Sequence, residues 1–279
     1  MTQQEQHAFD QAIALIPTGQ EAGRYRGATR RDYWNMVGPF GGITAAIMAQ
    51  AVLCHPQRLG LPIAITVNYA AAISAGPFEV HATPVRTNRS SQHWSVQMTQ
   101  NDAQGTAQIN TTATLVTALR RPTWSESDVP MPAVPRPETL RTMPIGPAGV
   151  DWLQRCEMRP VSGFIPKVWD GSGTHSETLL WLRDAMLRPL DFPLLTAMSD
   201  MFYPRVWLRR AKNVPAGTVS ITTYFHVDAE GLAQIGPGYL LGRAQGQRFY
   251  NGFFDQTAQL WSEGGQLLAT SNQMVYFKA

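Results

Sequence analysis

The sequence predicts an α+β fold made of two similar halves, with one continuous antiparallel sheet wrapped around two central helices. Three observations lead to this prediction. The order of elements in the first half, a helix followed by an antiparallel meander, recurs in the second half. A proline-rich stretch without periodicity separates the two halves. Because one helix cannot cover both faces of such a sheet, the halves are expected to pack against each other as a pseudo-dimer.

The first half is expected to contain one helix and four strands. An alanine-rich helix over 43–54 follows the glycine-containing segment 38–42 and stops at His55-Pro56. Apolar and polar residues alternate along 63–69, as they do in a strand with one buried face. Further strands are expected over 78–85, 93–100 and 106–116, with a tight turn at 102–105 before the last of them.

The second half repeats this order of elements. A strand over 177–182 leads into a helix over 193–203, which lies between two prolines. Residues 219–225 then alternate in the same way as 63–69. The remaining expected elements are a turn at 236–238 that joins two strands, strands over 239–245, 252–261 and 266–277, and a turn at 262–265.

Sequence matches between the halves support a repeat and predict the domain organisation. Ile65 matches Ile221 at an offset of 156 residues, and Gly105 matches Gly265 at an offset of 160. We expect an N-terminal domain over 1–118, a proline-rich linker over 119–150 and a C-terminal domain over 151–279.

The composition indicates a compact globular protein. The chain has 279 residues, of which 44% are apolar and 15% charged, and its net charge is +3. The basic residues are scattered and form no sustained face, so nucleic acid is not an expected partner, although the mild positive charge suits an anionic small molecule. The polar, acidic N-terminus is not a targeting segment, and no apolar run is long enough to span a membrane. A cytoplasmic protein without membrane association is therefore expected.

No metal or cofactor is expected. The six histidines show no metal-ligand spacing, and two cysteines are too few for a disulfide or zinc framework. There is no GxSxG nucleophile motif. The Gly236-Pro-Gly238 segment is expected to join two strands, which argues against a dinucleotide-binding fingerprint. An enzyme with this sequence would use water, a carboxylate and neutral polar groups.

Asp200 is the residue whose role is least obvious from local sequence. It falls in the last turn of the expected helix over 193–203, off the apolar stripe that includes Leu194 and Met198. A carboxylate is unfavourable there, because this end of a helix carries the negative pole. Two interpretations follow: an ordinary solvated aspartate, or a functional carboxylate at the interface between the halves.

Four stretches, in order, resemble the acyl-CoA thioesterase II family, in its bacterial thioesterase-like branch. They are Gly38-Pro-Phe-Gly-Gly42, the segments 181–191 and 217–226, and the segment 259–273. With the position of the linker, the resemblance covers nearly the whole chain. It implies a double-hotdog fold, in which each half is one helix wrapped by a meander.

The resemblance also implies an activity and its residues. Members of the family hydrolyse acyl-CoA with a water activated by Asp, Thr and Gln, which match Asp200, Thr218 and Gln273. At the same offsets the first half carries Pro62 and Ala113, which cannot replace these polar groups. One active site per chain is therefore expected, with acyl-CoA as the substrate.

For the other candidate site residues, a purely structural role is an alternative to the functional one. The backbone N–H groups of Gly41 and Gly42, at the start of the first helix, are candidates for an oxyanion hole, although glycines there also allow close packing. Apolar residues that could line an acyl tunnel, or simply belong to the core, are Trp34, Phe40, Met48, Met198 and Met201. Basic residues for the CoA phosphates are available, with no spacing that selects among them: Arg205, Arg209, Arg210, Lys212 and Arg248.

Two other functions stay open at the level of sequence. One is a hotdog hydratase or dehydratase acting on enoyl or 3-hydroxyacyl thioesters, which would want a histidine before a hotdog helix, where 38–42 carries none. The other is a non-catalytic acyl-CoA-binding protein, which would be expected to lack one of the three polar residues. The resemblance further implies a homo-oligomer. Acyl chain length depends on pocket depth and cannot be read from the sequence.

Overall fold

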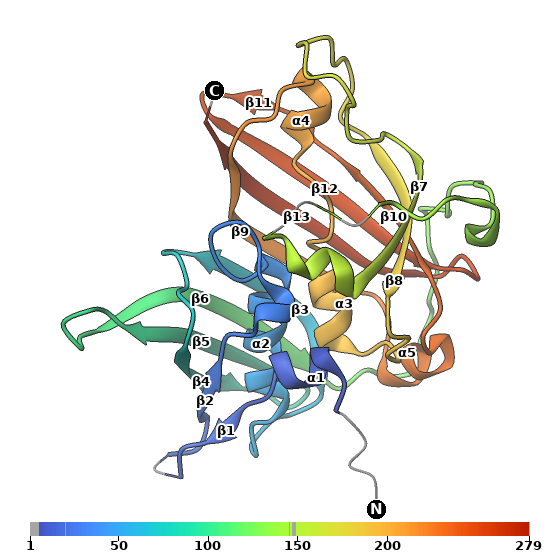
Figure 1. Cartoon of the computed structure of the whole chain (residues 1–279). Coiled ribbons are helices and arrows are strands. Elements are labelled where there is room, and N and C mark those ends of the chain that lie inside the picture. The colour runs from blue at the N-terminus through green and yellow to red at the C-terminus, as the bar shows by residue number, and fades with distance from the viewer. Residues whose placement is uncertain (1–5, 20, 145, 147–148, 279) are drawn as a thin grey trace, which may run out of the picture.

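The computed structural model describes residues 6–19, 21–144, 146 and 149–278. Within these residues, thirteen strands form a single sheet in which every pair of neighbours is antiparallel, and the helices lie against it (Figure 1). No helix in the described ranges has the length and apolar character needed to cross a membrane. The predicted α+β architecture with a continuous antiparallel sheet is confirmed.

The strands run in the order β1-β2-β4-β5-β6-β3-β9-β13-β12-β10-β8-β7, and β11 pairs with β12. The strands are β1 (Ile16–Pro17), β2 (Arg24–Ala28), β3 (Leu61–Tyr69), β4 (Pro77–Thr87), β5 (Ser91–Asn101), β6 (Ala107–Ala118), β7 (Cys156–Ser162), β8 (Thr178–Asp184), β9 (Ala216–Phe225), β10 (Leu240–Gln245), β11 (Phe249–Tyr250), β12 (Phe253–Ser262) and β13 (Leu267–Phe277). The α-helices are α1 (Ala8–Ala12), α2 (Gly41–Leu53), α3 (Phe192–Met198), α4 (Arg205–Arg210) and α5 (Ala229–Ile235), and the 3₁₀ helices are η1 (Arg31–Tyr33), η2 (Pro137–Thr139) and η3 (Asp151–Arg155).

The two halves of the sheet meet at β3 and β9, and this junction is symmetric. Thr66 pairs with Thr222, 156 residues further on, and their hydroxyl oxygens lie 2.9 Å apart. On either side of this pair, Ile65 pairs with Thr223 and Val67 pairs with Ile221. Ile221 is the counterpart of Ile65 at the offset of 156, and Thr223 is the counterpart of Val67, so the two pairs are equivalent to each other. This reciprocity is what a two-fold axis through the Thr66–Thr222 pair requires, because equivalent strands then face each other in opposite directions.

The helices α2 and α3 lie side by side across the middle of the sheet (Figure 1). Almost every residue of both helices is buried, which explains why neither shows a clear polar face. The side chain of Asp191 accepts a hydrogen bond from the backbone N–H of Leu194 at 2.9 Å and so caps the start of α3. The two helices therefore form the centre of the hydrophobic core.

Ion pairs join the N-terminal segment to the second half. Arg188 lies between Asp10 of α1 (2.8 Å) and Asp191 (2.6 Å), and its guanidinium group lies over the ring of Phe9. His7 contacts the buried carboxylate of Asp184 at 3.1 Å. The N-terminal helix is thus held against the turn that follows β8.

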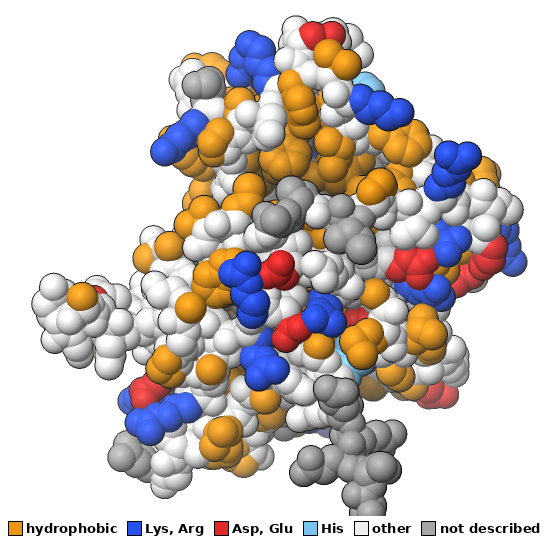
Figure 2. Space-filling model, in the orientation of Figure 1, with side chains coloured by type: hydrophobic (Ala, Val, Ile, Leu, Met, Phe, Trp, Pro, Cys, Tyr) orange, Lys and Arg blue, Asp and Glu red, His pale blue; other side chains and the backbone are white. Residues whose placement is uncertain are grey.

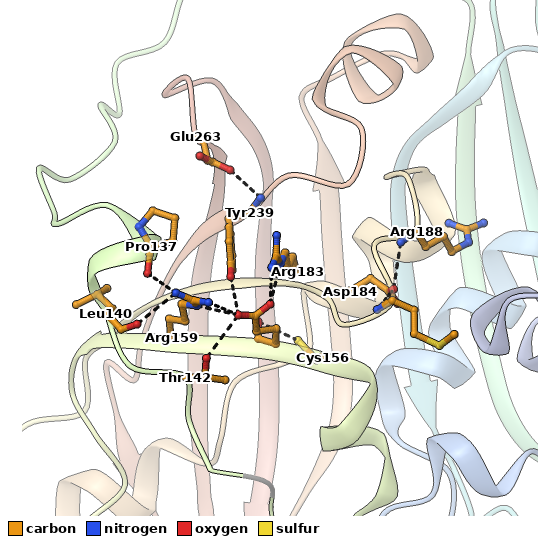
Figure 3. A network of polar contacts seen from close by, with 12 residues as sticks. Pro137, Leu140, Thr142, Cys156, Arg159, Arg183, Asp184, Arg188, Tyr239 and Glu263 are labelled. Atoms are coloured by element: carbon orange, nitrogen blue, oxygen red, sulfur yellow. Dashed lines mark hydrogen bonds and ion pairs between the residues drawn. The ribbon is translucent and has the colours of Figure 1, made fainter.

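A second polar network, shown in Figure 3, binds the linker to the outer face of the sheet. The carboxylate of Glu157 on β7 accepts hydrogen bonds from Tyr239, Arg159 and Arg183 at 2.6–2.8 Å. Arg159 also donates to the carbonyl oxygens of Pro137 and Leu140 in the linker. A segment without strands is thereby tied to the strands below it.

Two element predictions were wrong. The helix expected over 193–203 ends at Met198, and the chain turns through 199–204 before α4 begins, because Asp200 and Met201 make i→i−3 backbone bonds and proline disfavours helix before it. The Gly236–Gly238 turn joins α5 to β10, and not two strands. Helix α5 escaped detection because it is short and contains Gly231, and its N-terminus depends on capping by Asp228.

Several elements were not predicted at all. They are α1, β1, β2, β7, α4, β11 and the 3₁₀ helices η1, η2 and η3, each of which is short. Local periodicity is weak over so few residues, so their formation depends on contacts with the rest of the chain.

Candidate active site

Asp200 lies in the turn after α3, where residues of β13 hold the chain in place. The hydroxyl of Ser199 donates to the carbonyl oxygen of Leu195 at 2.9 Å. The hydroxyl of the buried Ser271 donates to the carbonyl oxygen of Ser199 at 3.4 Å. Since Ser271 and Gln273 point to the same face of β13, one strand contacts two consecutive residues of the turn.

A chain of hydrogen bonds connects Thr218, Gln273 and Asp200. The hydroxyl of Thr218 donates to the side-chain carbonyl oxygen of Gln273 at 3.2 Å. The side-chain amide of Gln273 donates to Oδ1 of Asp200 at 2.9 Å. The three residues that the family resemblance implied, from the turn after α3, from β9 and from β13, are therefore brought together. Thr218 fixes which way the Gln273 amide points, since an oxygen must accept on one side and an N–H donate on the other.

A β-bulge turns Thr218 toward the site. Counting back from Ile221, whose side chain is buried, strict alternation would bury Val219 and expose Thr218. The pairing of β9 with β13 skips one residue, so that Ser220 pairs with Met274 and Thr218 with Val275. Val219 is consequently 40% exposed, and Thr218 faces Gln273. The bulge has the re-aiming effect that such irregularities commonly have near functional sites.

The N-terminal end of α2 faces the Asp200 carboxylate. The backbone amide of Gly42 interacts with this carboxylate and favours its charged form. A methyl group added to Gly41 would lie 2.7 Å from Oδ2 of Asp200. The hydroxyl of Tyr69, at the end of β3, donates to the carbonyl oxygen of Gly41 at 2.8 Å. The site therefore contains groups from both halves, and the positive pole of α2 points at the carboxylate.

The pKa of Asp200 is raised to about 7. Burial is the main cause, because it penalises the charged form, and the hydrogen bond from Gln273 and the amide of Gly42 offset part of it. Burial also raises the pKa of the Tyr69 hydroxyl, with a further increase from the Asp200 charge, so this hydroxyl keeps its proton. A carboxylate with a pKa near neutrality can both accept and return a proton at physiological pH.

The structure changes the interpretation of the two glycines. The amide of Gly42 faces Asp200, so it is not directed at an open position where a thioester oxygen could bind. A Cβ on Gly42 would come 2.6 Å from the carbonyl oxygen of Ala197 in α3 and 2.4 Å from the ring of Phe40. The geometry of Gly42 favours close packing and stabilisation of the carboxylate, and the oxyanion role of Gly41 and Gly42 stays a prediction.

Four of the five residues expected to line an acyl tunnel lie in the core. Phe40, Met48, Met198 and Met201 are at most 3% exposed. The ring of Phe40 also stacks flat on Trp152 of η3, with ring centres 4.2 Å apart. An acyl chain would have to displace these side chains to reach them, and only Trp34 is partly exposed.

Part of the molecular surface near α3 and α4 is apolar. In the face shown in Figure 2, hydrophobic side chains gather in a hollow over the region that lies between α3 and α4 in Figure 1. Asp200 belongs to the connection between these two helices. The carboxylate is therefore close in sequence to an apolar part of the surface.

Tyr69 is the residue that sequence reasoning missed. Its counterpart at the offset of 156 is Phe225, so the first half carries a hydroxyl that the second half lacks. A comparison of the two halves at this offset could have identified it. The strand register also corrects one counterpart: Ile221 pairs with Gln273 and Ile65 with Leu115, so Leu115, and not Ala113, is the equivalent of Gln273. Leu115 is apolar as well, so the first half still lacks the amide.

Comparison with known families gives two matches that together cover most of the chain. Residues 30–120 match the family described as the acyl-CoA thioesterase N-terminal domain. Residues 128–277 match the family described as the acyl-CoA thioesterase C-terminal domain. No curated protein matches the chain.

Solved structures match it over nearly its whole length. A conserved protein of unknown function with a hot dog fold from Alicyclobacillus acidocaldarius is 43% identical over 98% of both chains, with a TM-score of 0.89. A putative thioesterase II from Thermobifida fusca is 21% identical over 98% of both chains, with a TM-score of 0.79. Acyl-CoA thioesterase II TesB2 from Mycobacterium marinum is 17% identical over 97% of this chain and 98% of its own, with a TM-score of 0.74. The last two similarities concern the fold, which is the double hotdog.

Proposed function

Since the chain belongs to the acyl-CoA thioesterase family, we propose that it hydrolyses acyl-CoA to free CoA and a carboxylic acid. The observation that supports this proposal best is the hydrogen-bonded series Thr218–Gln273–Asp200, which ends on a carboxylate with a pKa near neutrality. No metal or cofactor has a part in this reaction.

In the proposed reaction, Asp200 is the general base. A water molecule bound to its carboxylate attacks the thioester carbonyl carbon and transfers a proton to Asp200. The tetrahedral intermediate then collapses, the carbon–sulfur bond breaks, and the proton returns to the leaving thiolate. Gln273 and Thr218 hold the carboxylate and the water in one orientation, which is the contribution of proximity. The second N–H of the Gln273 amide is free to donate to the water or to the substrate oxygen.

Tyr69 is proposed as a positioning residue. Its hydroxyl holds the first carbonyl of α2 at 2.8 Å, next to the glycine that lies against Asp200. This contact sets where the positive end of α2 stands relative to the carboxylate. The site needs both halves, because Tyr69 and Gly42 come from the first and the three polar residues from the second. The equivalent second site would have Pro62 and Leu115 in place of Thr218 and Gln273. We therefore propose one active site per chain.

The boundaries of the domains and the oligomeric state belong to the same proposal. We keep 1–118, 119–150 and 151–279 as N-terminal domain, linker and C-terminal domain, because β6 ends at Ala118 and β7 begins at Cys156. A homo-oligomer is expected from the family. Light scattering after size-exclusion chromatography measures the mass directly.

Thiol release from a panel of acyl-CoA substrates tests the activity. Short, medium, long and aromatic acyl groups are assayed with a colorimetric thiol reagent, for the wild type, Asp200→Asn and the matched control Asp128→Asn. Asp128 is exposed in the linker, so its variant should match the wild type. We expect Asp200→Asn to lose at least about 100-fold in kcat, the usual scale for a general base. The wild-type rate should rise with pH through about 7, as Asp200 loses its proton.

Two results would contradict the proposal. Absence of thiol release with every acyl group would reject thioester hydrolysis and leave the acyl-CoA-binding alternative. Equal turnover of Asp200→Asn and the wild type would reject the role of Asp200. The same samples incubated with enoyl-CoA test the hydratase alternative, because hydration removes the enoyl absorbance without releasing thiol.

A further inference from the structure

An open cavity of about 510 Å³ lies beside the C-terminal end of α4. Three separate segments line it: the stretch before β8, with His175 and Ser176; the last turn of α4, with Arg209 and Arg210; and the connection from β10 to β12, with Arg248. The cavity thus brings together three of the five basic residues that the sequence alone could not rank.

The charge of this cavity is positive and not neutralised from within. Among the residues that the structure describes, Arg209, Arg210 and Arg248 form no ion pair; Arg209 donates to the carbonyl oxygen of Gly173, and Arg248 lies over the ring of Tyr250. Favourable interaction with the carbonyl end of α4 explains why Arg209 and Arg210 occur in the last turn of that helix. It does not explain the position of Arg248, which belongs to another segment.

Two carboxylates close to the cavity in sequence, Glu177 and Asp255, are already engaged. Glu177, next to Ser176, pairs with Arg243 at 2.5 Å. Asp255 accepts hydrogen bonds from the backbone N–H groups of Gln247 (3.1 Å) and Arg248 (2.7 Å), and so shapes the loop that carries Arg248. Neither acid neutralises the three arginines.

A fourth guanidinium group contacts the cavity wall through Ser176, which lines the cavity. Arg205 is 0% exposed and donates to the carbonyl oxygen of Ser176 at 3.0 Å and the hydroxyl of Thr178 at 2.7 Å. Its partners are neutral, whereas buried charges are usually paired with an opposite charge. Burial lowers the pKa of Arg205 to about 10, so the group still carries its charge at neutral pH and adds to the positive potential at the cavity wall.

We propose that this cavity binds the phosphate groups of the CoA moiety of the substrate, an inference that rests on the proposed function. Guanidinium groups bind phosphate through planar, paired N–H donors, and an anion here would face the three arginines that line the cavity. The chain from Asp200 to Arg209 spans at most about 24 Å, five extended residues followed by one turn of helix. An elongated substrate with its thioester at Asp200 and its nucleotide at the arginines can bridge this separation.

Kinetics with two kinds of thioester separate phosphate binding from chemistry. Acyl-CoA carries the phosphates, and the corresponding acyl N-acetylcysteamine thioester lacks them. We expect the double variant Arg209→Gln/Arg210→Gln to raise KM for acyl-CoA at least about tenfold, with kcat unchanged and no change for the truncated thioester. The control Arg86→Gln/Arg89→Gln removes the same charge at an exposed hairpin of the first half and should leave both substrates unaffected. Equal KM values for the two double variants would overturn the proposal.

A binding measurement tests the cavity independently of turnover. Titration calorimetry with adenosine 3′,5′-bisphosphate should show binding to the wild type and to the control, weakened at least about tenfold in Arg209→Gln/Arg210→Gln. Binding of this nucleotide by a protein that hydrolyses no thioester would support the cavity while rejecting the proposed function. Absence of nucleotide binding, equal binding by all variants, or binding of inorganic phosphate alone would overturn the inference.

Discussion

Asp200 occupies a position that costs folding stability and is useful for chemistry. Its pKa is 3.8 as an isolated group and about 7 in the folded protein. Between these values the folded state binds more protons than the unfolded state, so the free energy of unfolding falls as pH rises. The cost is nearly absent at pH 3, grows between about pH 4 and pH 7 and is complete above pH 7. Replacing the carboxylate by a neutral amide should remove it.

Asp200→Asn is accordingly expected to be inactive and more stable than the wild type. At pH 8 the gain in unfolding free energy should be about 1–3 kcal/mol, less than the full shift implies because the side chain is partly exposed. At pH 3 the gain should nearly vanish, since the carboxyl group is then largely protonated in both states. Urea unfolding at the two pH values measures it, with Asp128→Asn as a control that should show no pH-dependent difference. A gain of the same size at both pH values would contradict the assigned pKa.

Tyr69→Phe tests the hydroxyl that holds the start of α2. Loss of the hydrogen bond to the Gly41 carbonyl should lower kcat about tenfold. KM should stay within a factor of two, because the proposed role of this hydroxyl is to position α2 and not to bind acyl-CoA. Tyr33→Phe is the matched control: its hydroxyl is buried and has no hydrogen-bond partner in the described part of the chain. Equal kcat values for the two variants would argue against a positioning role.

At the scale of elements, two local features place the site: the bulge at Val219 and the close approach of α2 and α3. The bulge recurs in the first half, where Ile63 is skipped between Pro62 and Ala64. Its position at the same offset of 156 shows that the irregularity belongs to the repeat, although the residue before it differs. Thr218 supplies a hydroxyl where the first half has Pro62.

Gly42→Ala tests the approach of the two helices. The added methyl group would collide with the Ala197 carbonyl and the Phe40 ring, so the helices must separate. We expect a loss of about 1–3 kcal/mol in unfolding free energy, typical of overpacking, together with reduced activity because the α2 terminus moves away from Asp200. Gly264→Ala, where the nearest atom would be 3.7 Å away, should change neither quantity. A stable and fully active Gly42→Ala variant would show that the contact yields easily.

At the scale of the whole molecule, a shared sheet and polar contacts hold the linker and both halves together. Glu157 is central to the linker contacts. Burial alone would raise its pKa, but hydrogen bonds from Tyr239, Arg159 and Arg183 outweigh it and lower the pKa to about 2, from 4.5. This contribution to stability is therefore complete above pH 4.5 and is lost as pH falls toward 2.

Glu157→Gln should destabilise the protein at pH 7 by about 1–3 kcal/mol, because three donors lose a charged acceptor. Below pH 2 the difference from the wild type should disappear, since Glu157 is then largely protonated in both states. Urea unfolding across this range measures the effect. Glu126→Gln, exposed in the same linker, serves as the control and should match the wild type throughout. A pH-independent difference would show that the carboxylate charge is not responsible.

Much of the fold could be predicted because the long elements carry their own periodic pattern. The helix α2 and the strands β3, β5 and β13 all begin within two residues of their predicted starts. The short elements could not be predicted, because α4, α5 and β7 form only where the rest of the chain gives them a surface. The break after Met198 belongs to the same class: it follows from backbone bonds in a turn that β13 supports.

The sequence by itself determined the repeat, the proline-rich joint and the residue types at Asp200, Thr218 and Gln273, since these depend on composition and order alone. Only the tertiary structure decided that Thr218 faces inward, that Leu115 is the counterpart of Gln273, and that Tyr69 and Gly42 approach Asp200 from the other half. The reason is that side-chain direction in a sheet follows from register and bulges. Both are set by pairing between strands far apart in the chain, which no local pattern records.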